Sequence, residues 1–361
     1  MDALTKIKVK DFFKTSRVPI VASVVVAAAV MTAGYALYGA IASQFFASLE
    51  ADQGTISGNA EAVSDANASG GKALLFKAGA PTPPPASWWK PTPDKPIALH
   101  WVLGDALNVN DPVQMGVRDF TGKTLPEPDV YDIDGEYNTK ATVDYLHNKG
   151  KKVICYFDAG VYETYRSDAY KFKALSPQIW GKADVGWDNS YWLDIRRVSE
   201  LEPIMKTRMQ MCKDKGFDAI EPDEIDGWEN DSGFALTYQD QLNYNKALAR
   251  WAHEMGMSIG QKGDLIQVRD LVGDFDWTLN EECYQYNECT SVYDPVLNKN
   301  FPGLQLYVQA NKAVFIAEYK AFDATKWNSI CANSATNHFN TTRFKLGLPN
   351  NGGRMPCTGT W

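Results

Sequence analysis

Residues 216–228 read GFDAIEPDEIDGW, and this stretch decides the fold. It starts with a short apolar run that leads straight into a cluster of carboxylates. Side chains alternate between the two faces of a β-strand, so if Ile220 faces outward, Glu221 and Asp223 face inward. Asp223 then stands at the carboxyl-terminal end of the strand, which is the mouth of the active site in a parallel α/β barrel. The alternative is an acidic surface loop, but these acids follow an apolar strand instead of lying in a polar tract.

Apolar strands and amphipathic helices alternate along the chain from residue 96 onward. Strands are predicted at residues 97–103, 129–133, 152–157, 217–220, 258–261, 277–282, 313–318 and 344–348. Helices are predicted at residues 139–149, 200–215, 242–255 and 265–272. Strands and helices alternating in this number predict an α/β fold, a (β/α)8 TIM barrel. The alternative is a doubly wound open sheet, but no GxGxxG or GxxxxGK[ST] run follows a strand, so nucleotide binding lacks support.

A second carboxylate is predicted at the end of the strand at residues 277–282. If Leu279 faces the helices, Glu282 faces the mouth of the barrel and lies near Asp223. Glycoside hydrolysis uses such a pair, because one carboxyl protonates the leaving oxygen while the other attacks the anomeric carbon or activates water. Glu281 takes this place if the strand phase differs by one residue. A separation of roughly 5 to 5.5 Å would give retention and roughly 6.5 to 9.5 Å inversion, and the sequence leaves both open.

Other acidic and aromatic residues fall near the predicted strand ends. A cleft rich in carboxylates favours a cationic polymer, and aromatic faces stack on sugar rings and attract ammonium groups. Lys262 is predicted to pair with one of the acids and keep it ionised. The predicted substrate-binding residues are Asp105, Asp132, Asp134, Tyr156, Asp158, Glu221, Trp228, Lys262, Tyr284 and Glu318.

The amino-terminal residues predict a membrane anchor. Residues 18–46 contain no charged residue, and as a helix they would be roughly 43 Å long, enough to cross a hydrocarbon core of about 30 Å. Residues 1–17 are basic, which predicts a cytosolic tail and a single-pass type II protein of the cell membrane with its catalytic domain outside the cell. A cleaved signal peptide is the alternative, because Ala40-Ile41-Ala42 has the form of a cleavage site.

A stalk is predicted between the anchor and the barrel. Residues 47–95 are rich in Ala, Gly and Ser and then in Pro, which is typical of a flexible spacer followed by a stiffer one. Trp88 and Trp89 at its end are interpreted either as a sugar platform or as a seal on the bottom of the barrel. The barrel domain is predicted to cover residues 96–361.

The net charge limits the kinds of partner that the protein can bind, and the cysteines indicate the compartment in which it folds. The chain carries a net charge of −8 and its first 17 residues carry +3, so the remainder carries −11, which argues against a nucleic-acid partner. Six cysteines follow the anchor, an even number that predicts disulfides. Nearness in sequence favours Cys283 with Cys289 and Cys331 with Cys357, leaving Cys155 and Cys212. With no CxxC pair and four histidines, neither a metal site nor a cofactor is predicted. Sequons for N-glycosylation begin at Asn67, Asn230 and Asn340.

Three blocks of this sequence resemble glycoside hydrolase family 114. They are ICYFDAG at residues 154–160, GFDAIEPDEIDGW at residues 216–228 and LNEECYQY at residues 279–286. The resemblance spans about residues 96 to 319 and implies a TIM-barrel endo-α-1,4-polygalactosaminidase, like the fungal enzymes related to spherulin 4. The implied substrate is α-1,4-linked galactosamine in partly deacetylated galactosaminogalactan-type polysaccharide.

The resemblance also implies roles for three acids. Asp223 would be the nucleophile, Glu282 the general acid/base and Asp158 a substrate-binding carboxylate. Two other functions stay open from the residues alone: an α-galactosidase-like hydrolase of neutral sugars, and a wall-polysaccharide binding protein without catalysis.

Overall fold

The computed structural model describes residues 60–64, 72–76, 88–295 and 297–357, and the chain divides into two compact units at residues 83 and 84. In the first unit, β1 (Ala60–Ser64) pairs with β2 (Lys72–Phe76) in an antiparallel sheet, so the predicted stalk contains regular structure. The predicted cytosolic tail and membrane anchor lie outside the described residues. Within the described ranges, no helix is long and apolar enough to span a bilayer.

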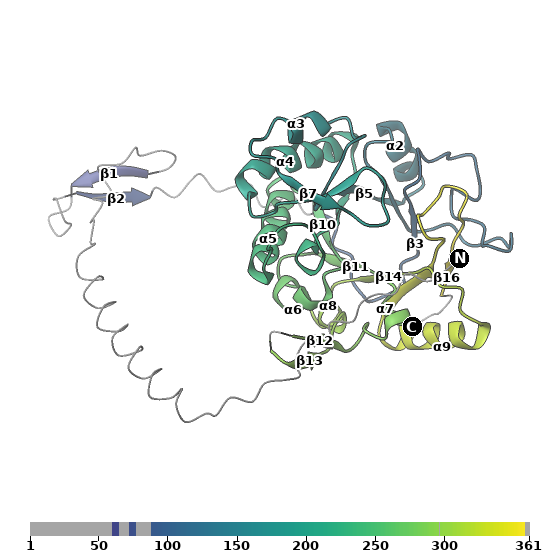
Figure 1. Ribbon diagram of the computed structural model, residues 1–361. Helices are drawn as coiled ribbons and strands as arrows, with labels where there is room; N and C mark the ends of the chain where they lie inside the picture. The colour runs from purple at the N-terminus through teal and green to yellow at the C-terminus, as the bar shows by residue number, and fades with distance from the viewer. Residues whose placement is uncertain (1–59, 65–71, 77–87, 296, 358–361) are drawn as a thin grey trace, which may run out of the picture. The chain divides into compact units, whose positions relative to one another are not determined.

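The second unit is built on a nine-stranded sheet whose first eight strands are parallel and follow one another in sequence order. The ninth, β16 (Met355–Pro356), runs antiparallel to its neighbour. This arrangement confirms an α/β barrel-like fold (Figure 1). The eight parallel strands are β3 (Leu99–Val102), β4 (Val130–Asp134), β5 (Lys152–Asp158), β9 (Ala219–Asp223), β10 (Ser258–Lys262), β11 (Trp277–Glu281), β14 (Val314–Glu318) and β15 (Phe339–Arg343).

The last parallel strand differs from the prediction. The sequence predicted it at residues 344–348, whereas β15 ends at Arg343. Gly347 and Leu348 have positive φ angles, which no strand can hold. This segment instead turns back to β3, where the carbonyl of Leu348 accepts a hydrogen bond from the N–H of Leu103 at 3.1 Å. The turn links the two end strands of the barrel.

Alternating side chains form two separate cores. One contains residues of β3, β4, β5, β9, β11 and β14 without any helix residue, and is therefore the inner core of the barrel. The other joins the outer face of the strands to the helices. Ala219 belongs to the inner core and Ile220 to the outer one, which is the phase predicted for this strand. Leu279, however, belongs to the inner core beside Trp277, so the phase predicted for β11 is wrong by one residue.

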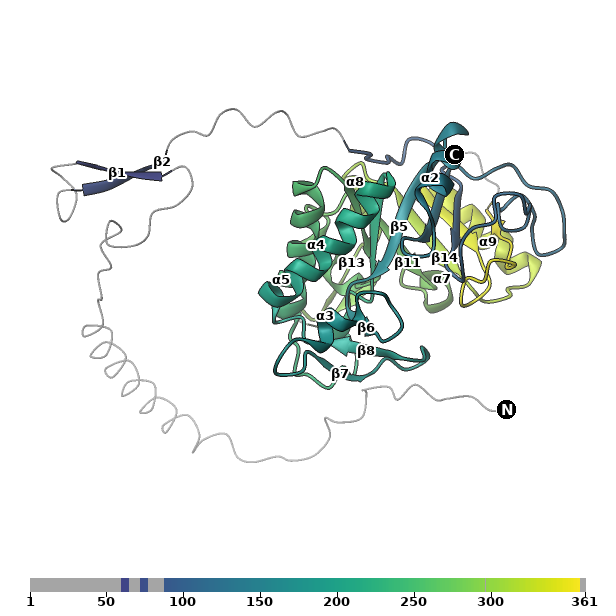
Figure 2. The same cartoon turned by 90° about the horizontal axis from the view of Figure 1, so that it is seen from above.

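Helices surround the barrel (Figure 1), with α4 and α5 side by side on one flank (Figure 2). Local signals fix their ends: Thr237 and Asp240 form a capping box at the start of α5, and Gly216 ends α4 in a left-handed conformation. The connection from β3 to β4, at residues 103–129, contains no helix along its fully described length. The helices are α2 (Lys140–Asn148), α3 (Ala169–Lys173), α4 (Val198–Lys215), α5 (Tyr238–Glu254), α6 (Val268–Leu271), α7 (Cys283–Tyr286), α8 (Gln305–Gln309) and α9 (Ala324–Thr336), with 3₁₀ turns η3 (Gly227–Glu229) and η4 (Leu265–Gln267).

Two small sheets lie outside the barrel sheet. The insertion after β5 forms β6 (Val161–Glu163), β7 (Trp180–Ala183) and β8 (Ser190–Leu193), which group with α3 at one end of the barrel (Figure 2). This end holds the carboxyl terminus of β5. The second sheet is the hairpin of β12 (Val292–Asp294) and β13 (Lys299–Phe301).

Three disulfides confirm the predicted pairing. Cys155 on β5 bonds to Cys212 on α4, Cys283 to Cys289, and Cys331 to Cys357. Disulfides form in oxidising compartments, so this domain is typical of an extracellular or secreted protein.

The residues just before the first barrel strand belong to the barrel unit and not to a stalk. Trp88 stacks on His253 with ring centroids 4.7 Å apart, and Trp89 contacts Trp277, the first residue of β11, at 6.3 Å. The carbonyl of Pro91 accepts a hydrogen bond from the N–H of Ala313, which precedes β14. The two tryptophans therefore seal the amino-terminal end of the barrel.

One predicted glycosylation site is buried. Asn340 is 8% exposed, and its Nδ2 donates to the carbonyl of Val314 while its Oδ1 accepts from the N–H of Ile97. Its side-chain amide therefore belongs to the interior of the fold and is not open to a glycan.

Candidate active site

Three neighbouring strands bring two carboxylates and one ammonium together at the carboxyl-terminal end of the barrel. Asp223 ends β9, Lys262 ends β10 and Glu281 ends β11. The Nζ of Lys262 lies 2.8 Å from Oδ1 of Asp223 and 2.6 Å from Oε2 of Glu281. Because these oxygens lie 2.8 Å and 2.6 Å from one nitrogen, they are at most about 5.4 Å apart, which is below the roughly 6.5 to 9.5 Å between the carboxyls of inverting glycoside hydrolases.

Glu282 does not lie at this position, which corrects the sequence prediction. It follows the end of β11 with a φ of 58° and precedes the first residue of α7. The physical reason is packing: Trp277 and Leu279 fill the inner core, so every second residue, and thus Glu281, faces inward. Glu281, the alternative residue, is the one that meets Lys262.

Lys262 is held as an ammonium by its surroundings. Burial alone would lower its pKa, but Asp223 and Glu281 outweigh burial and raise the pKa well above its usual value. The ammonium also lies 5.2 Å from the ring centroid of Trp101. On the other side, the hydroxyl of Tyr319 donates a hydrogen bond to Glu281. Lys262 therefore fixes both carboxylates, and Tyr319, the residue after β14, also fixes Glu281.

A second pair of carboxyls lies one layer deeper in the barrel. Asp132 on β4 and Glu221 on β9 are fully buried, and no N–H group of the described residues donates a hydrogen bond to either one. Burial raises the pKa of Asp132 to about 8. Burial and then Asp132 raise the pKa of Glu221 well above its usual value. Burial therefore favours the protonated form of this pair.

Arg166 organises one wall of the site. Its guanidinium contacts Asp134 at 2.6 Å and Glu163 at 2.7 Å, and it lies 5.2 Å and 5.3 Å from the ring centroids of Tyr137 and Tyr165. Arg166 comes from the insertion at residues 165–194, to which the sequence assigned no role. The one sequence feature that could have indicated its role is the spacing of three residues between Glu163 and Arg166.

Asp158 lies on the same wall. The hydroxyl of Tyr156 lies 3.3 Å from both of its carboxyl oxygens. Burial, followed by the nearby carboxylates of Glu163 and Asp223, raises the pKa of Asp158 well above its usual value. These surroundings therefore favour the protonated form of Asp158, which can donate a hydrogen bond to a ligand.

Two cavities adjoin at Asp223, Glu224 and Glu281, which line both. The first has a volume of about 250 Å³, and we call it the aromatic cavity. The second has a volume of about 390 Å³, and we call it the acidic cavity. The aromatic cavity is lined by Trp101, Tyr137, Tyr156, Tyr165, Trp187 and Tyr319, and the acidic cavity by Asp223, Glu224, Asp226, Glu229, Asp264, Glu281 and Glu288.

Four of the ten predicted binding residues line these two cavities. Asp134, Tyr156 and Asp158 line the aromatic cavity, and Lys262 lines the acidic one. Asp132 and Glu221 lie beneath the carboxylates, out of contact with either cavity.

Four further predicted binding residues also line neither cavity. Asp105 is exposed and accepts a hydrogen bond from the N–H of Ala106. Trp228 holds a residue of the acidic cavity in place, because its Nε1 donates a hydrogen bond of 3.1 Å to Asp264. Glu318 faces the helices and accepts a hydrogen bond from the N–H of Tyr284. This bond ties α7, which contains Tyr284, to the end of β14. Nearness to a strand end predicted these residues, but Glu318 lies on the outer face of β14, and Asp105, Trp228 and Tyr284 lie beyond the strands.

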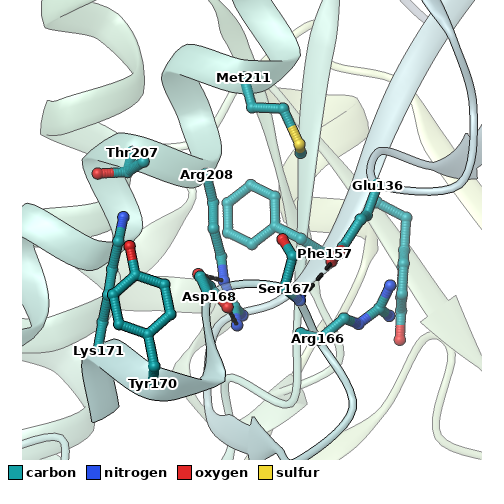
Figure 3. A pocket seen from close by; sticks show the side chains of 11 residues that line it. Glu136, Phe157, Arg166, Ser167, Asp168, Tyr170, Lys171, Thr207, Arg208 and Met211 are labelled. Atoms are coloured by element: carbon teal, nitrogen blue, oxygen red, sulfur yellow. Dashed lines mark hydrogen bonds and ion pairs between the residues drawn. The ribbon is translucent and has the colours of Figure 1, made fainter. Parts of the chain in front are cut away.

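A third cavity, of about 290 Å³, lies behind Arg166 between α3 and α4 (Figure 3). Arg208 extends from α4 to Asp168, which accepts two hydrogen bonds of 2.8 Å. The N–H of Ser167 donates to Glu136. Arg208 and Asp168 thus pair with each other, as do Ser167 and Glu136. In the described residues, no cluster of three or more His, Cys, Asp or Glu side chains is arranged to hold a metal ion.

Two carboxylates converging at the carboxyl-terminal end of an α/β barrel define a glycoside hydrolase. Comparison with known proteins agrees with this class. The sequence profile of glycoside-hydrolase family GH114 matches residues 79–360, and the chain belongs to this family and is a glycoside hydrolase.

Solved structures give further likenesses. Aspergillus fumigatus Ega3, solved in complex with galactosamine, is 30% identical, with 74% of this chain and 97% of that chain covered and a TM-score of 0.61. The glycoside hydrolase domain of PelA from Pseudomonas aeruginosa is 12% identical, with 71% of this chain and 97% of that chain covered and a TM-score of 0.47. No curated protein sequence matches this chain.

Proposed function

We propose that this glycoside hydrolase cleaves α-1,4-linked galactosamine within partly deacetylated galactosaminogalactan-type polysaccharide. The observation that carries the proposal is the placement of Asp223 and Glu281 on either side of the Lys262 ammonium, at the junction of two cavities. A cavity in each direction from the reacting pair suits an enzyme that cuts inside a chain. The carboxylates around the pair suit a cationic sugar polymer. Membership of GH114 and the likeness to Ega3, solved with galactosamine, support the choice of sugar.

Asp223 is the proposed nucleophile. Lys262 lies 2.8 Å from its Oδ1, and the N–H of Glu224 donates to the same oxygen at 2.8 Å, so two donors hold this oxygen in place. The carboxylate attacks the anomeric carbon, and the bond to the leaving oxygen breaks. The product is a covalent glycosyl-enzyme with Asp223.

Glu281 is the proposed general acid and base. Its side chain is 34% exposed, compared with 13% for Asp223, so it can exchange protons with solvent. It protonates the leaving glycosidic oxygen and later takes a proton from the water that hydrolyses the glycosyl-enzyme. While Asp223 is esterified, Lys262 still compensates the negative charge on Glu281. The configuration at the anomeric carbon is retained because two displacements occur.

The test is incubation of the full chain with an α-1,4-galactosamine polymer, with mass spectrometry of the products and NMR of the first anomer released. Oligosaccharides of several lengths with the α-configuration are expected. Release of neutral galactose from a neutral polymer, without action on the amino polymer, would favour the α-galactosidase-like alternative. Binding without any product would favour a binding protein.

We further propose that residues 18–46 anchor the protein in the cell membrane as a single-pass type II protein, with the barrel outside the cell. The stretch is free of charge and follows a basic tail, and the disulfides suit the outside of the cell. Carbonate extraction of membranes tests this: an anchored protein stays in the pellet, whereas one with a cleaved signal peptide appears in the medium lacking residues 1–42.

A further inference from the structure

Two of the carboxyl groups that line the aromatic cavity have no partner in the described part of the chain. Among the described residues, seven carboxyl side chains line this cavity. Five of them contact a cation or a hydroxyl group: Asp134, Asp158, Glu163, Asp223 and Glu281. The other two are Asp184 and Glu224, and no described residue forms a hydrogen bond or an ion pair with either carboxyl.

Asp184 is held at the cavity by the sheet that follows β5. It comes directly after β7, and its N–H donates a hydrogen bond of 3.0 Å to the carbonyl of Ser190, the first residue of β8. The N–H of Lys182 on β7 donates at 2.9 Å to the carbonyl of Ser232, which lies in the loop after Asp223. Asp184 is 8% exposed, and it lines the cavity on the same side of the barrel as the proposed nucleophile.

Glu224 reaches the same place from β9. It directly follows Asp223 and lines both cavities. Burial and then Asp223 raise the pKa of Asp184 to about 6. Burial and then Asp223 also raise the pKa of Glu224 well above its usual value, and Asp184 acts in the same direction. The two carboxyls therefore repel the nucleophile, and Asp184 and Glu224 repel each other.

An amino sugar carries the group that this arrangement lacks. Carboxyl groups that are withdrawn from water without a donor or a cation cost stability. An ammonium has three N–H donors and no acceptor, so one ammonium can bind two carboxylates. In an α-1,4-galactosamine chain the amine is on C2, the carbon bonded to the anomeric carbon. Because Asp223 attacks the anomeric carbon, the amine of the same unit comes close to the carboxyls that surround Asp223.

The proposed reaction gives these carboxyls a second effect. The transition state resembles an oxocarbenium ion, so positive charge develops on the carbon next to the one that bears the ammonium. These two like charges repel each other. Carboxylates beside the ammonium reduce this repulsion, because their negative charge is close to both positive charges. They therefore favour the transition state as well as the binding of the substrate.

We infer that Asp184 and Glu224 together bind the ammonium of the sugar unit whose anomeric carbon Asp223 attacks. The inference deepens the proposed function and rests on it. It also gives a function to the insertion at residues 165–194, which brings a carboxyl from outside the barrel sheet to the reacting unit.

The test measures the binding of galactosamine and of galactose, which differ only at C2, to the full chain by NMR titration. The unaltered protein should bind galactosamine at least tenfold more tightly than galactose, as expected for one charge-assisted contact. In the double variant Asp184→Asn with Glu224→Gln, the affinity for galactosamine should fall at least tenfold, and that for galactose should stay within twofold. An equal loss for both sugars, an unchanged preference for galactosamine, or no binding of galactosamine by the unaltered protein would overturn the inference.

Asp188→Asn is the matched control. Asp188 is exposed in the loop that also carries Asp184, and it lines neither cavity, so this variant should keep both affinities. Stability distinguishes ligand binding from a structural role. Since the double variant removes two carboxyls that repel each other, its midpoint of denaturant unfolding should be unchanged or higher. A lower midpoint, or a variant that does not fold, would show that these carboxyls support the fold and would overturn the inference.

Cleavage of the α-1,4-galactosamine polymer by the same samples separates the inference from the proposed function. The double variant should lower kcat/KM on this polymer at least tenfold. If the unaltered protein cleaves the polymer and the double variant cleaves it equally well, the inference fails and the proposed function stands. If the unaltered protein neither cleaves the polymer nor prefers galactosamine to galactose, both fail.

Discussion

The N–H of Gly160 donates a hydrogen bond of 3.1 Å to the carbonyl oxygen of Asp223, and the N–H of Ala159 donates to the same oxygen at 2.9 Å. The end of β5 therefore holds the backbone of the proposed nucleophile. This contact requires glycine, because a Cβ at residue 160 would lie 1.5 Å from the carbonyl oxygen of Glu224. The glycine of the ICYFDAG block thus fixes the position of a carboxylate 63 residues later in the chain.

Replacing this glycine should displace Asp223 from Lys262. We expect Gly160→Ala to lower kcat at least tenfold and to destabilise the fold by about 1 to 3 kcal/mol, as overpacking does. Enzyme kinetics and denaturant unfolding measure the two effects. Gly273→Ala is the matched control, because a Cβ there meets nothing within 4 Å and the backbone conformation is not left-handed. If both variants had the same kcat and the same stability, the close approach of residue 160 to Glu224 would not matter for activity or folding.

The two neighbouring glutamates should differ sharply. We expect Glu281→Gln to lower kcat by about 10² to 10⁴-fold, the usual contribution of a general acid and base, because Glu281 lies beside Lys262 and Asp223. Glu282→Gln should keep most of the activity, since this residue lines neither cavity. Steady-state kinetics on the galactosamine polymer distinguish them. A larger loss in the Glu282 variant would contradict the proposed role of Glu281.

Lys262 should set the pH at which the carboxylate pair becomes active. Its own pKa is raised well above the usual value by Asp223 and Glu281 against the opposing effect of burial, so it stays charged across the working pH range. In Lys262→Met the two carboxylates lose their shared cation, and ionising the nucleophile then requires a higher pH. The acid limb of the kcat/KM profile should move to higher pH. Lys262→Arg keeps the charge and should move the limb less, and an unmoved limb in the methionine variant would contradict this role.

The deep carboxyl pair should make stability depend on pH. Burial raises the pKa of Asp132 to about 8 in the folded protein, compared with about 3.9 in an unfolded chain. Between these values the folded protein holds a proton that the unfolded chain has lost, so stability should fall as pH rises from about 4 to 8. Asp132→Asn should flatten this slope, measured by denaturant unfolding at several pH values. Asp144→Asn should leave the slope unchanged, and an unchanged slope in the Asp132 variant would refute the assignment.

The order of the strands and the place of Asp223 were predictable because they depend on local pattern. An apolar run that ends in carboxylates predicts a strand end, and parallel strands bring their ends to one rim. Seven of the eight predicted strands overlap those of the barrel. The eighth was misplaced because residues 344–348 are apolar in composition, although the left-handed backbone at Gly347 and Leu348 excludes a strand.

The remaining features depend on contacts between distant segments. Leu279 faces inward because Trp277 and Phe315 share its core, and no property of residues 277–282 alone reveals this. Glu318 ends a strand but faces α7, and Arg166 meets Asp134 from 32 residues away. Such pairings depend on the three-dimensional packing of several strands. They therefore lie beyond what periodicity can predict.

The seal formed by Trp88 and Trp89 has a practical consequence for handling the enzyme. Both side chains pack at the amino-terminal ends of the strands, opposite to the rim that carries Asp223 and Glu281. The described part of this unit thus begins at the closed end of the barrel. Coupling the domain to a bead or a chip at this end would leave the cleft facing the bulk solution, open to long polymer chains.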